Sequence, residues 1–283
     1  MSARPEAPAP LRVPVVDTHC HLDIGQDGRE GEADTLSVSE ALAAAASVGV
    51  TRIVQVGCDL ESSRWSANAA DEHDHIVATV ALHPNEAPRI FADHGRSALD
   101  SAYEQIAGLA AEPQVRAVGE TGLDFFRTTG EGLVIQEESF RRHIAIAKAV
   151  GKPVIIHDRE AHEDVVRVLL SEGPPDTVVF HCFSGGPELA QICAEHGWLM
   201  SFAGTVTFKN AQSIRDALAI APLDLVLVET DAPFLTPVPF RGRVNASYLV
   251  PLTVRVMAEV RGIGEDEMAQ ALWDNAARVF GPL

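Results

Sequence analysis

Short apolar runs alternate along the chain with longer segments in which apolar residues recur at helical spacing. The runs are VPVVD, TRIVQVG, IVATVAL, VRAVGE, PVIIH, TVVFH, WLMSFAG and LVLVET. Strands that are apolar throughout, rather than alternating with polar residues, are typical of a parallel sheet buried on both faces. The pattern therefore predicts eight parallel strands.

The segments between these runs have the spacing of amphipathic helices. They are SVSEALAAAASVG, ESSRWSANAADEH, RSALDSAYEQIAGLAAE, EESFRRHIAIAKAVG, AHEDVVRVLLSEG, PELAQICAEHG, NAQSIRDALAIA and ASYLVPLTVRVMAEVRG. A strand followed by a helix, repeated eight times, predicts an α/β fold, a single-domain (β/α)8 TIM barrel. The last segment, EDEMAQALWDNAARVF, predicts an extra helix packed on the outside. The rival is a doubly wound open sheet, which needs a glycine-rich phosphate loop after the first strand, and DTHCHLD contains none.

The length of 283 residues suits one barrel domain. The start, MSARPEAPAP, predicts a disordered N-terminal tail over residues 1–12, with the barrel domain over residues 13–283. It has no apolar core like that of a signal peptide, and no apolar run approaches the roughly 20 residues that cross a bilayer. We therefore expect a cytoplasmic protein that does not bind membranes.

The composition adds one constraint on function. The chain has a formal net charge of −18, which repels long polyanions and argues against a protein that coats duplex DNA. An enzyme that acts on a strand end stays possible, because a metal centre supplies local positive charge. The four cysteines show no C-x-x-C spacing, so we expect reduced thiols and no cysteine-based metal site.

Imidazole or carboxylate side chains follow five of the eight predicted strands. They are His19 and His21 after the first strand, Glu120 after the fourth, His157 after the fifth, His181 after the sixth, and Glu229 and Asp231 after the eighth. A lone histidine or glutamate at a strand end is more often structural. In a barrel, however, these strand ends meet at the active-site face, where so many polar groups would be costly to bury without a ligand. Imidazole and carboxylate together suit zinc, manganese or magnesium, so the pattern predicts a metal site.

The number of these groups predicts two divalent ions, because a single catalytic zinc usually takes three protein ligands. We expect one ion to be held by His19, His21 and Asp231, and the other by His157 and His181. Glu120, placed between the two groups in the sequence, is the expected bridging carboxylate. Two ions a few ångströms apart share a water, lower its pKa and clamp the oxygens of a scissile bond.

Seven further motifs follow VDTHCHLD in a recognisable order, namely ALHP, GETGLDFF, HDREA, HCFSG, GTVTFKNA, ETDAPFLTP and RGRVN. In these motifs the chain resembles the TatD-type metal-dependent hydrolases of the amidohydrolase superfamily, from VDTHCHLD to NAARVF. The resemblance implies the same six metal ligands, His19, His21, Glu120, His157, His181 and Asp231. It also implies phosphodiester chemistry, that of a deoxyribonuclease acting from the 3′ end of a DNA strand.

The chain departs from the family pattern at two places. Asn85 stands where the family often has a second histidine after the His-Pro pair, and Ala246-Ser247 stands where it has Glu-Pro. Both lie where substrate, rather than metal, would be held. They leave the hydrolase prediction intact and leave the substrate open.

On this basis we expect Asp231 to bind metal and accept a proton from the attacking water, with Glu120 and His83 as the other catalytic residues. His83, after the third strand, is expected to donate a hydrogen bond to a phosphate oxygen; a structural histidine is nearly as good an interpretation. Candidate substrate contacts in loops on the same face are Arg127, Arg159, Arg241, Arg243 and Asn245. For each of these arginines, the alternative interpretation is a solvated charge on the protein surface.

Two other functions stay open. One is a divalent-metal hydrolase of another ester or amide bond, such as an aminoacyl-tRNA ester or a small phosphoester. The other is a non-catalytic scaffold, against which the full ligand set argues. A serine hydrolase is disfavoured, because HCFSGG lacks the G-x-S-x-G elbow.

Overall fold

A computed structural model describes residues 4–24 and 36–281 of the chain. The chain forms two compact units. The first unit consists of residues 1–55 and 185–283, and the second of residues 56–184. Whether residues 13–283 act as one domain stays a prediction.

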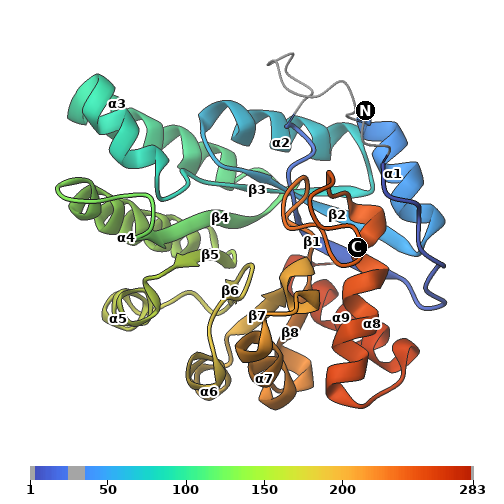
Figure 1. Ribbon diagram of the computed structural model, residues 1–283. Helices are drawn as coiled ribbons and strands as arrows, with labels where there is room; N and C mark the ends of the chain where they lie inside the picture. The colour runs from blue at the N-terminus through green and yellow to red at the C-terminus, as the bar shows by residue number, and fades with distance from the viewer. Residues whose placement is uncertain (1–3, 25–35, 282–283) are drawn as a thin grey trace. The chain divides into compact units, whose positions relative to one another are not determined.

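All eight predicted strands are present, and each is followed by a helix (Figure 1). The strands are β1 Val15–Cys20, β2 Val50–Gly57, β3 Ile76–Val80, β4 Val115–Asp124, β5 Val154–Arg159, β6 Val178–Phe180, β7 Leu199–Phe202 and β8 Val226–Val228. They follow chain order in one eight-stranded sheet. Every residue of β1, β3, β6, β7 and β8 is buried, as expected for strands covered on both faces. The predicted fold class, an α/β fold of the (β/α)8 TIM-barrel type, is confirmed.

The helices also follow the predicted pattern. They are α1 Val38–Ser47, α2 Leu60–Glu72, α3 Glu86–Ala110, α4 Gly132–Val150, α5 His162–Glu172, α6 Pro187–His196, α7 Gln212–Ile220, α8 Val250–Arg261 and α9 Glu265–Phe280. The main difference is α3, which was expected to begin at Arg96. Its first turns carry Pro88, which an α-helix tolerates near its start, and Gly95, whose φ of 80° interrupts the helix. None of the helices in the described part of the chain is long and apolar enough to cross a membrane.

In the first unit, β1 pairs in parallel with β2, and β7 pairs in parallel with β8. A parallel bridge between Cys20 and Ala232 joins the end of β1 to the segment that follows β8. Two backbone hydrogen bonds support this bridge, from Asp231 N to His19 O at 2.9 Å and from His21 N to Ala232 O at 2.8 Å. The ends of β1 and β8 are therefore held together by the main chain.

Helix α9 and the first described residues complete the first unit. The side-chain amide of Asn275 on α9 donates to the carbonyls of Leu223 and Val226 at the start of β8, at 2.9 and 2.8 Å. Next to α9 runs α8 (Figure 1). At the N-terminus, the hydroxyl of Tyr248 donates to the carbonyl of Pro5 at 2.8 Å, and Leu11 is buried. Residues 1–12 were predicted to be a disordered tail. Pro5 and Leu11 of this segment contact the first unit.

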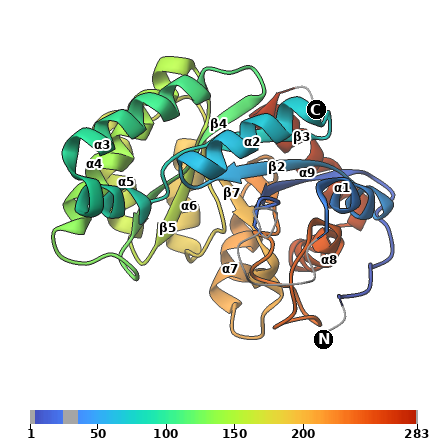
Figure 2. The same ribbon diagram turned by 90° about the horizontal axis from the view of Figure 1, so that it is seen from above.

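In the second unit, β3 pairs with β4, β4 with β5 and β5 with β6, all in parallel. Helices α3 and α4 lie side by side in both views (Figures 1 and 2). His143 of α4 is fully buried; its Nε2 accepts from the backbone of Leu82 at 3.0 Å, and its Nδ1 donates to Ser139 O at 2.7 Å. The buried His143 thus holds the segment that leads from β3 to His83.

Candidate metal centre

The first unit brings together three of the predicted ligands, His19, His21 and Asp231. The Nε2 atoms of His21 and His19 lie 3.3 and 3.9 Å from Asp231 Oδ1. The two rings are 5.1 Å apart in an edge-to-face arrangement, and both histidines are buried. Asp231 has a φ of 55°, a backbone conformation that is uncommon for a residue other than glycine. These three side chains lie close together, and their role as ligands of one ion stays a prediction.

Asp17 positions the strand end that carries Asp231. Its carboxylate is fully buried and accepts from the backbone and the hydroxyl of Thr230, at 2.9 and 2.6 Å. Burial raises the pKa of Asp17 to about 6, and the hydrogen bonds from Thr230 oppose that rise. Asp17 therefore ties β1 to the residue that precedes Asp231.

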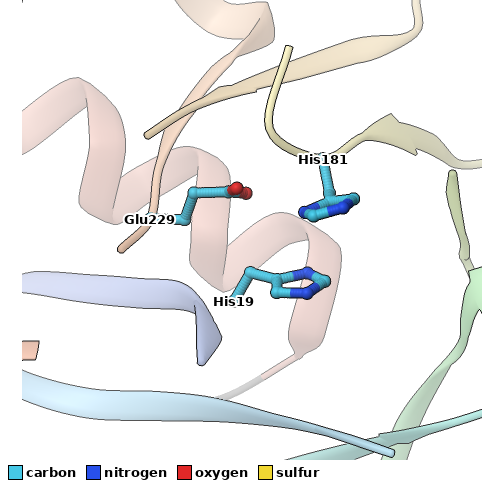
Figure 3. A group of neighbouring side chains, drawn as sticks. All are labelled: His19, His181 and Glu229. Carbon is cyan, nitrogen blue, oxygen red and sulfur yellow. The ribbon is translucent and has the colours of Figure 1, made fainter. Parts of the chain in front are cut away.

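Glu229 is a further candidate metal ligand of the first unit. It follows β8 directly, is fully buried, and places a carboxylate oxygen within 4.8 Å of a ring nitrogen of His19 (Figure 3). Figure 3 also draws His181, which comes from the end of β6 in the second unit. Glu229 stands at a predicted strand end and does not belong to the predicted ligand set.

The second unit brings together the other three predicted ligands. Glu120 Oε2 lies 3.1 Å from His157 Nδ1 and 2.9 Å from His181 Nε2. The other oxygen, Oε1, accepts from the thiol of Cys58 at 3.3 Å. Glu120 and His181 are buried, and the rings of His157 and His181 are 5.7 Å apart. One carboxylate oxygen thus faces two imidazoles from different strands.

His83 belongs to the same cluster. It lies three residues beyond the end of β3, and one ligand atom from each of His83, Glu120 and His157 lies within 4.8 Å of the others. Its Nδ1 accepts from the backbone of Asn85 at 3.1 Å, which leaves the ring proton of the neutral form on Nε2. Burial lowers the pKa of His83 to about 4, so the ring is neutral at neutral pH.

The electrostatics of the cluster favour a charged carboxylate beside the histidines. Burial by itself would raise the pKa of Glu120, but His181 and His83 hold it well below its usual range. Burial would likewise lower the pKa of His157, and its contacts with Asp124 and Glu120 raise it instead. Positive charge beside Glu120 thus favours its ionised form, and a divalent ion would supply such charge.

Asp124 is a further carboxylate of this cluster and was not predicted from the sequence. It ends β4, is 1% exposed, and its Oδ2 lies 3.4 Å from His157 Nε2. A signal was available, because residues four apart in a strand point to the same face, and Asp124 stands four residues after Glu120 in GETGLDFF. The pKa of Asp124 is lowered, against the effect of burial, by His157, Asn85 and the backbone of Arg127.

The predicted substrate contacts fall into two kinds. Arg159 lies over the ring of Phe126 at 4.0 Å in the second unit, and Arg241 lies over the ring of Phe208 at 4.1 Å in the first. Of the four predicted arginine contacts, Arg127, Arg241 and Arg243 are exposed and Arg159 is half-buried. Asn245 differs, because it is buried and its side-chain nitrogen donates to the carbonyls of Thr230 and Phe234, at 2.9 and 2.6 Å. These bonds use the amide hydrogens of Asn245 within the segment after β8.

The donors present fit divalent ions. Each unit offers imidazole nitrogens and at least one carboxylate within ligand distance of one another, and all these atoms are of the N and O type that zinc, manganese and magnesium accept. A TIM-barrel fold with such donors in or just after β1, β4, β5, β6 and β8 is typical of a metal-dependent hydrolase.

The comparisons with known proteins identify the family. The model of the TatD related DNase family matches residues 16–281, and the chain belongs to this family. The resemblance noted in the motifs is thereby confirmed. Among the relatives is an uncharacterized metal-dependent hydrolase TatD of Mycobacterium tuberculosis, 42% identical over 94% of this chain and 98% of the relative. The uncharacterized metal-dependent hydrolase YcfH of Escherichia coli is 38% identical over 94% of this chain and 95% of its own.

Solved structures agree with this assignment. The crystal structure of YjjV, a TatD homologue from Escherichia coli, has a TM-score of 0.81 at 30% identity and covers 95% of this chain and 98% of its own. A TatD family hydrolase from Entamoeba histolytica has the same fold, with a TM-score of 0.81 at 17% identity over 96% of this chain and 99% of its own. The chain is a TatD-type metal-dependent hydrolase.

Proposed function

We propose that the chain is a deoxyribonuclease that cleaves phosphodiester bonds at the 3′ end of a DNA strand with a metal-activated water. The observation that carries the proposal is Glu120, whose one carboxylate oxygen faces His157 and His181 at 3.1 and 2.9 Å. A buried carboxylate between imidazoles is suited to hold an ion that contacts phosphate oxygens. The family description, TatD related DNase, supports DNA as the substrate.

The proposed cofactor is a pair of divalent ions, magnesium, manganese or zinc. His19, His21 and Asp231 would hold one ion, His157 and His181 would hold the other, and Glu120 would be the ligand common to both. When bound, such ions lower the pKa of a water and neutralise charge on the phosphate. The carboxylate of Asp231, which lies beside His21 in the first group, would accept the proton of that water.

The other residues orient the substrate. His83 is neutral and carries its proton on Nε2, so it donates a hydrogen bond to a phosphate oxygen. The exposed arginines Arg127, Arg241 and Arg243, together with Arg159, make the phosphate contacts. On a protein with a formal net charge of −18, this use of a few cations suits a strand end rather than a long duplex. Asn245 contributes indirectly, because its side chain holds the backbone carbonyls of Thr230 and Phe234 in place.

A second candidate is hydrolysis of an aminoacyl-tRNA ester or another carboxyl ester. It is favoured by a cavity of about 70 Å³ in the first unit that has His21 in its wall. The wall is otherwise mostly apolar, with Pro233, Ala246 and Tyr248 among its residues. Ala246 and Ser247 in this wall replace the Glu-Pro of the family pattern. Such a cavity would accept a small apolar acyl side chain.

The deciding experiment compares two substrates under the same metal conditions. Single-stranded DNA labelled at its 3′ end is incubated with the protein and Mg²⁺, Mn²⁺ or EDTA, and an aminoacyl-tRNA is tested in parallel. We expect release of labelled nucleotide with Mg²⁺ or Mn²⁺ and none with EDTA. Metal-loaded protein that leaves DNA intact and cleaves the ester would replace the first proposal by the second.

The variant Glu120→Ala tests the metal centre itself. We expect it to lose bound metal and at least a hundredfold of the activity, because it removes the carboxylate shared by both ions. Glu104→Ala, at an exposed position of α3, is the control and is expected to keep both. Full metal content in Glu120→Ala would defeat the bridging role of Glu120.

A further inference from the structure

Phe234 is a large apolar side chain that is exposed beside the proposed ligands of the first unit. It follows Asp231 by three residues in the chain. Its ring lies 6.4 Å from the ring of His21 in an edge-to-face arrangement, and the residue is 52% exposed. Single exposed apolar residues are common on protein surfaces. Phe234 differs from most of them because it lies next to two residues that are proposed to bind metal.

Hydrogen bonds hold the backbone around Phe234. Its N–H donates to the carbonyl of Asp231 at 2.9 Å, and its carbonyl accepts from the side-chain amide of Asn245 at 2.6 Å. The N–H of Asn245 in turn donates to the carbonyl of Pro233, which precedes Phe234, at 3.0 Å. The ring is therefore presented from a fixed backbone, so a ligand that contacts it loses little affinity to the ordering of the chain.

The part of the chain that contains Phe234 has no acidic residue. The chain has 40 acidic residues among 283, yet none lies within residues 197–215 or 232–258, which we call the acid-free stretches. Asp231, the acid that precedes the second stretch, is a proposed metal ligand. On a protein with a formal net charge of −18, two long stretches without acids indicate a surface that accepts an anion.

The two acid-free stretches meet in the first unit. The N–H of Val238 donates to the hydroxyl of Thr207 at 2.9 Å, and the guanidinium of Arg241 lies over the ring of Phe208 at 4.1 Å. Arg241 and Arg243 are exposed. Exposed cations and the exposed ring thus belong to one segment, which is hydrogen-bonded to the other acid-free stretch.

A single nucleic-acid strand matches both features of this segment. Its phosphates pair with cations, and the faces of its bases stack on aromatic rings. In a duplex the bases stack on one another, whereas unpaired bases are open to such a contact. We propose that Phe234 is a substrate-binding residue that stacks on an unpaired base at the 3′ end of the DNA strand, while Arg241 and Arg243 contact the phosphates. The inference rests on the proposed function and adds a contact to the base.

Phe234→Leu tests the stacking contact. Leucine keeps an apolar side chain beside His21 and lacks the aromatic face. Binding of the Mn²⁺-loaded protein to a short single strand, labelled at its 5′ end, is measured by fluorescence anisotropy, and phosphorothioate linkages at the 3′ end slow cleavage. We expect Phe234→Leu to bind this strand about 5- to 50-fold more weakly than the wild type, with unchanged metal content.

A second strand, whose last two nucleotides lack their bases, separates stacking from other effects. The wild type should bind this strand about as weakly as Phe234→Leu binds the intact strand, and the variant should lose little further affinity. Arg241→Gln provides the contrast, because it removes a proposed phosphate contact. Its loss of affinity should be the same on both strands, and its binding should depend less on salt.

Phe91→Leu is the matched control. Phe91 is also an exposed phenylalanine beside an arginine, since Arg96 lies over its ring at 5.0 Å. It belongs to α3 of the second unit, where Asp93 and Asp100 are close to it in the sequence. We expect Phe91→Leu to bind both strands with the affinity of the wild type.

Three results would overturn the inference. They are unchanged binding of the intact strand by Phe234→Leu, an equal loss by this variant on the strand without terminal bases, and an equal loss in Phe91→Leu. A wild-type protein that binds no DNA and cleaves an aminoacyl ester would instead overturn the proposed function, and the inference with it. Cleavage of DNA by the wild type together with unchanged binding by Phe234→Leu overturns only the inference.

Discussion

Asp17 lowers the stability of the fold but fixes the position of the segment before Asp231. It is fully buried, and burial of a charge is expensive even when hydrogen bonds from Thr230 compensate in part. The consequence is a pKa of about 6 against 3.8 for an ordinary aspartate. In return, the carboxylate links β1 to the segment that carries Asp231.

The raised pKa of Asp17 predicts that this residue destabilises the folded protein increasingly as the pH rises. A carboxyl group with a higher pKa in the folded than in the unfolded state stabilises the fold while protonated, and this stabilisation is lost as the pH rises through the folded pKa. In metal-free protein, Asp17→Asn should therefore gain stability relative to the wild type between pH 4 and pH 6, by up to about 3 kcal/mol. Urea unfolding in EDTA at pH 4, 5, 6 and 7 measures this difference.

The control is Asp71→Asn, at an exposed position at the end of α2. Its stability relative to the wild type should vary little over the same range. A constant difference between Asp17→Asn and the wild type at all four pH values would show that Asp17 ionises normally in the folded chain.

Several single residues have an unusual backbone conformation. The described residues other than glycine with positive φ are Glu160, Cys182, Asp231 and Leu235. Cys182 follows His181 directly, and Asp231 is itself a proposed ligand. Such conformations are disfavoured for these residue types, so the surrounding structure must hold them, and they often mark functional sites.

At the scale of elements, the approach of β4 to β5 depends on Gly122. It pairs with His157 in the register, and its φ of 143° is one that side chains rarely adopt. A Cβ at this position would lie 2.1 Å from the carbonyl oxygen of His157. The two strands that carry Glu120, Asp124 and His157 can therefore lie this close only with glycine there.

Gly122→Ala is predicted to destabilise the protein by more than about 2 kcal/mol, because it adds both a clash and an unfavourable φ. It should also weaken metal binding by displacing His157. Gly108→Ala is the control: Gly108 lies in α3, a Cβ there would meet nothing within 4 Å, and alanine should stabilise the helix by roughly 0.5–1 kcal/mol. Chemical denaturation of both variants measures this, and equal stability of the two would contradict the prediction.

At the scale of the whole molecule, charge and metal act together. The chain has 40 acidic residues against 22 lysines and arginines, and some of its acids are buried beside the proposed ligands. Bound divalent ions would offset part of this repulsion and stabilise the folded state by mass action.

Removal of metal should therefore lower the melting temperature. With free ion at about 100 times its dissociation constant, binding contributes about 2.7 kcal/mol, or a shift of roughly 5–10 °C for a chain of this size. Differential scanning calorimetry of EDTA-treated protein, with and without added Mn²⁺ or Zn²⁺, measures the shift. In Glu120→Ala the added ion should have much less effect, and an undiminished shift in that variant would place the stabilising ions elsewhere.

The sequence by itself determined the fold class and the residues that were proposed as ligands. Strands buried on both faces must be apolar along their whole length, so the eight runs are local signals that need no knowledge of distant contacts. The ligands stand directly after such runs, and parallel strands present those ends to a common face. His19, His21 and Asp231 indeed lie together in the first unit, as Glu120, His157 and His181 do in the second.

Only the tertiary structure decided which side chains support these groups. Asn85, Asp124 and Thr128 have ordinary loop or strand-end positions in the sequence, and their hydrogen bonds link segments far apart in the chain. Asn245 was expected at the substrate, and its amide proved to be bonded to the backbone after β8. The reason is physical: apolar periodicity reports burial, whereas the partner of a polar side chain depends on where the folded backbone directs it.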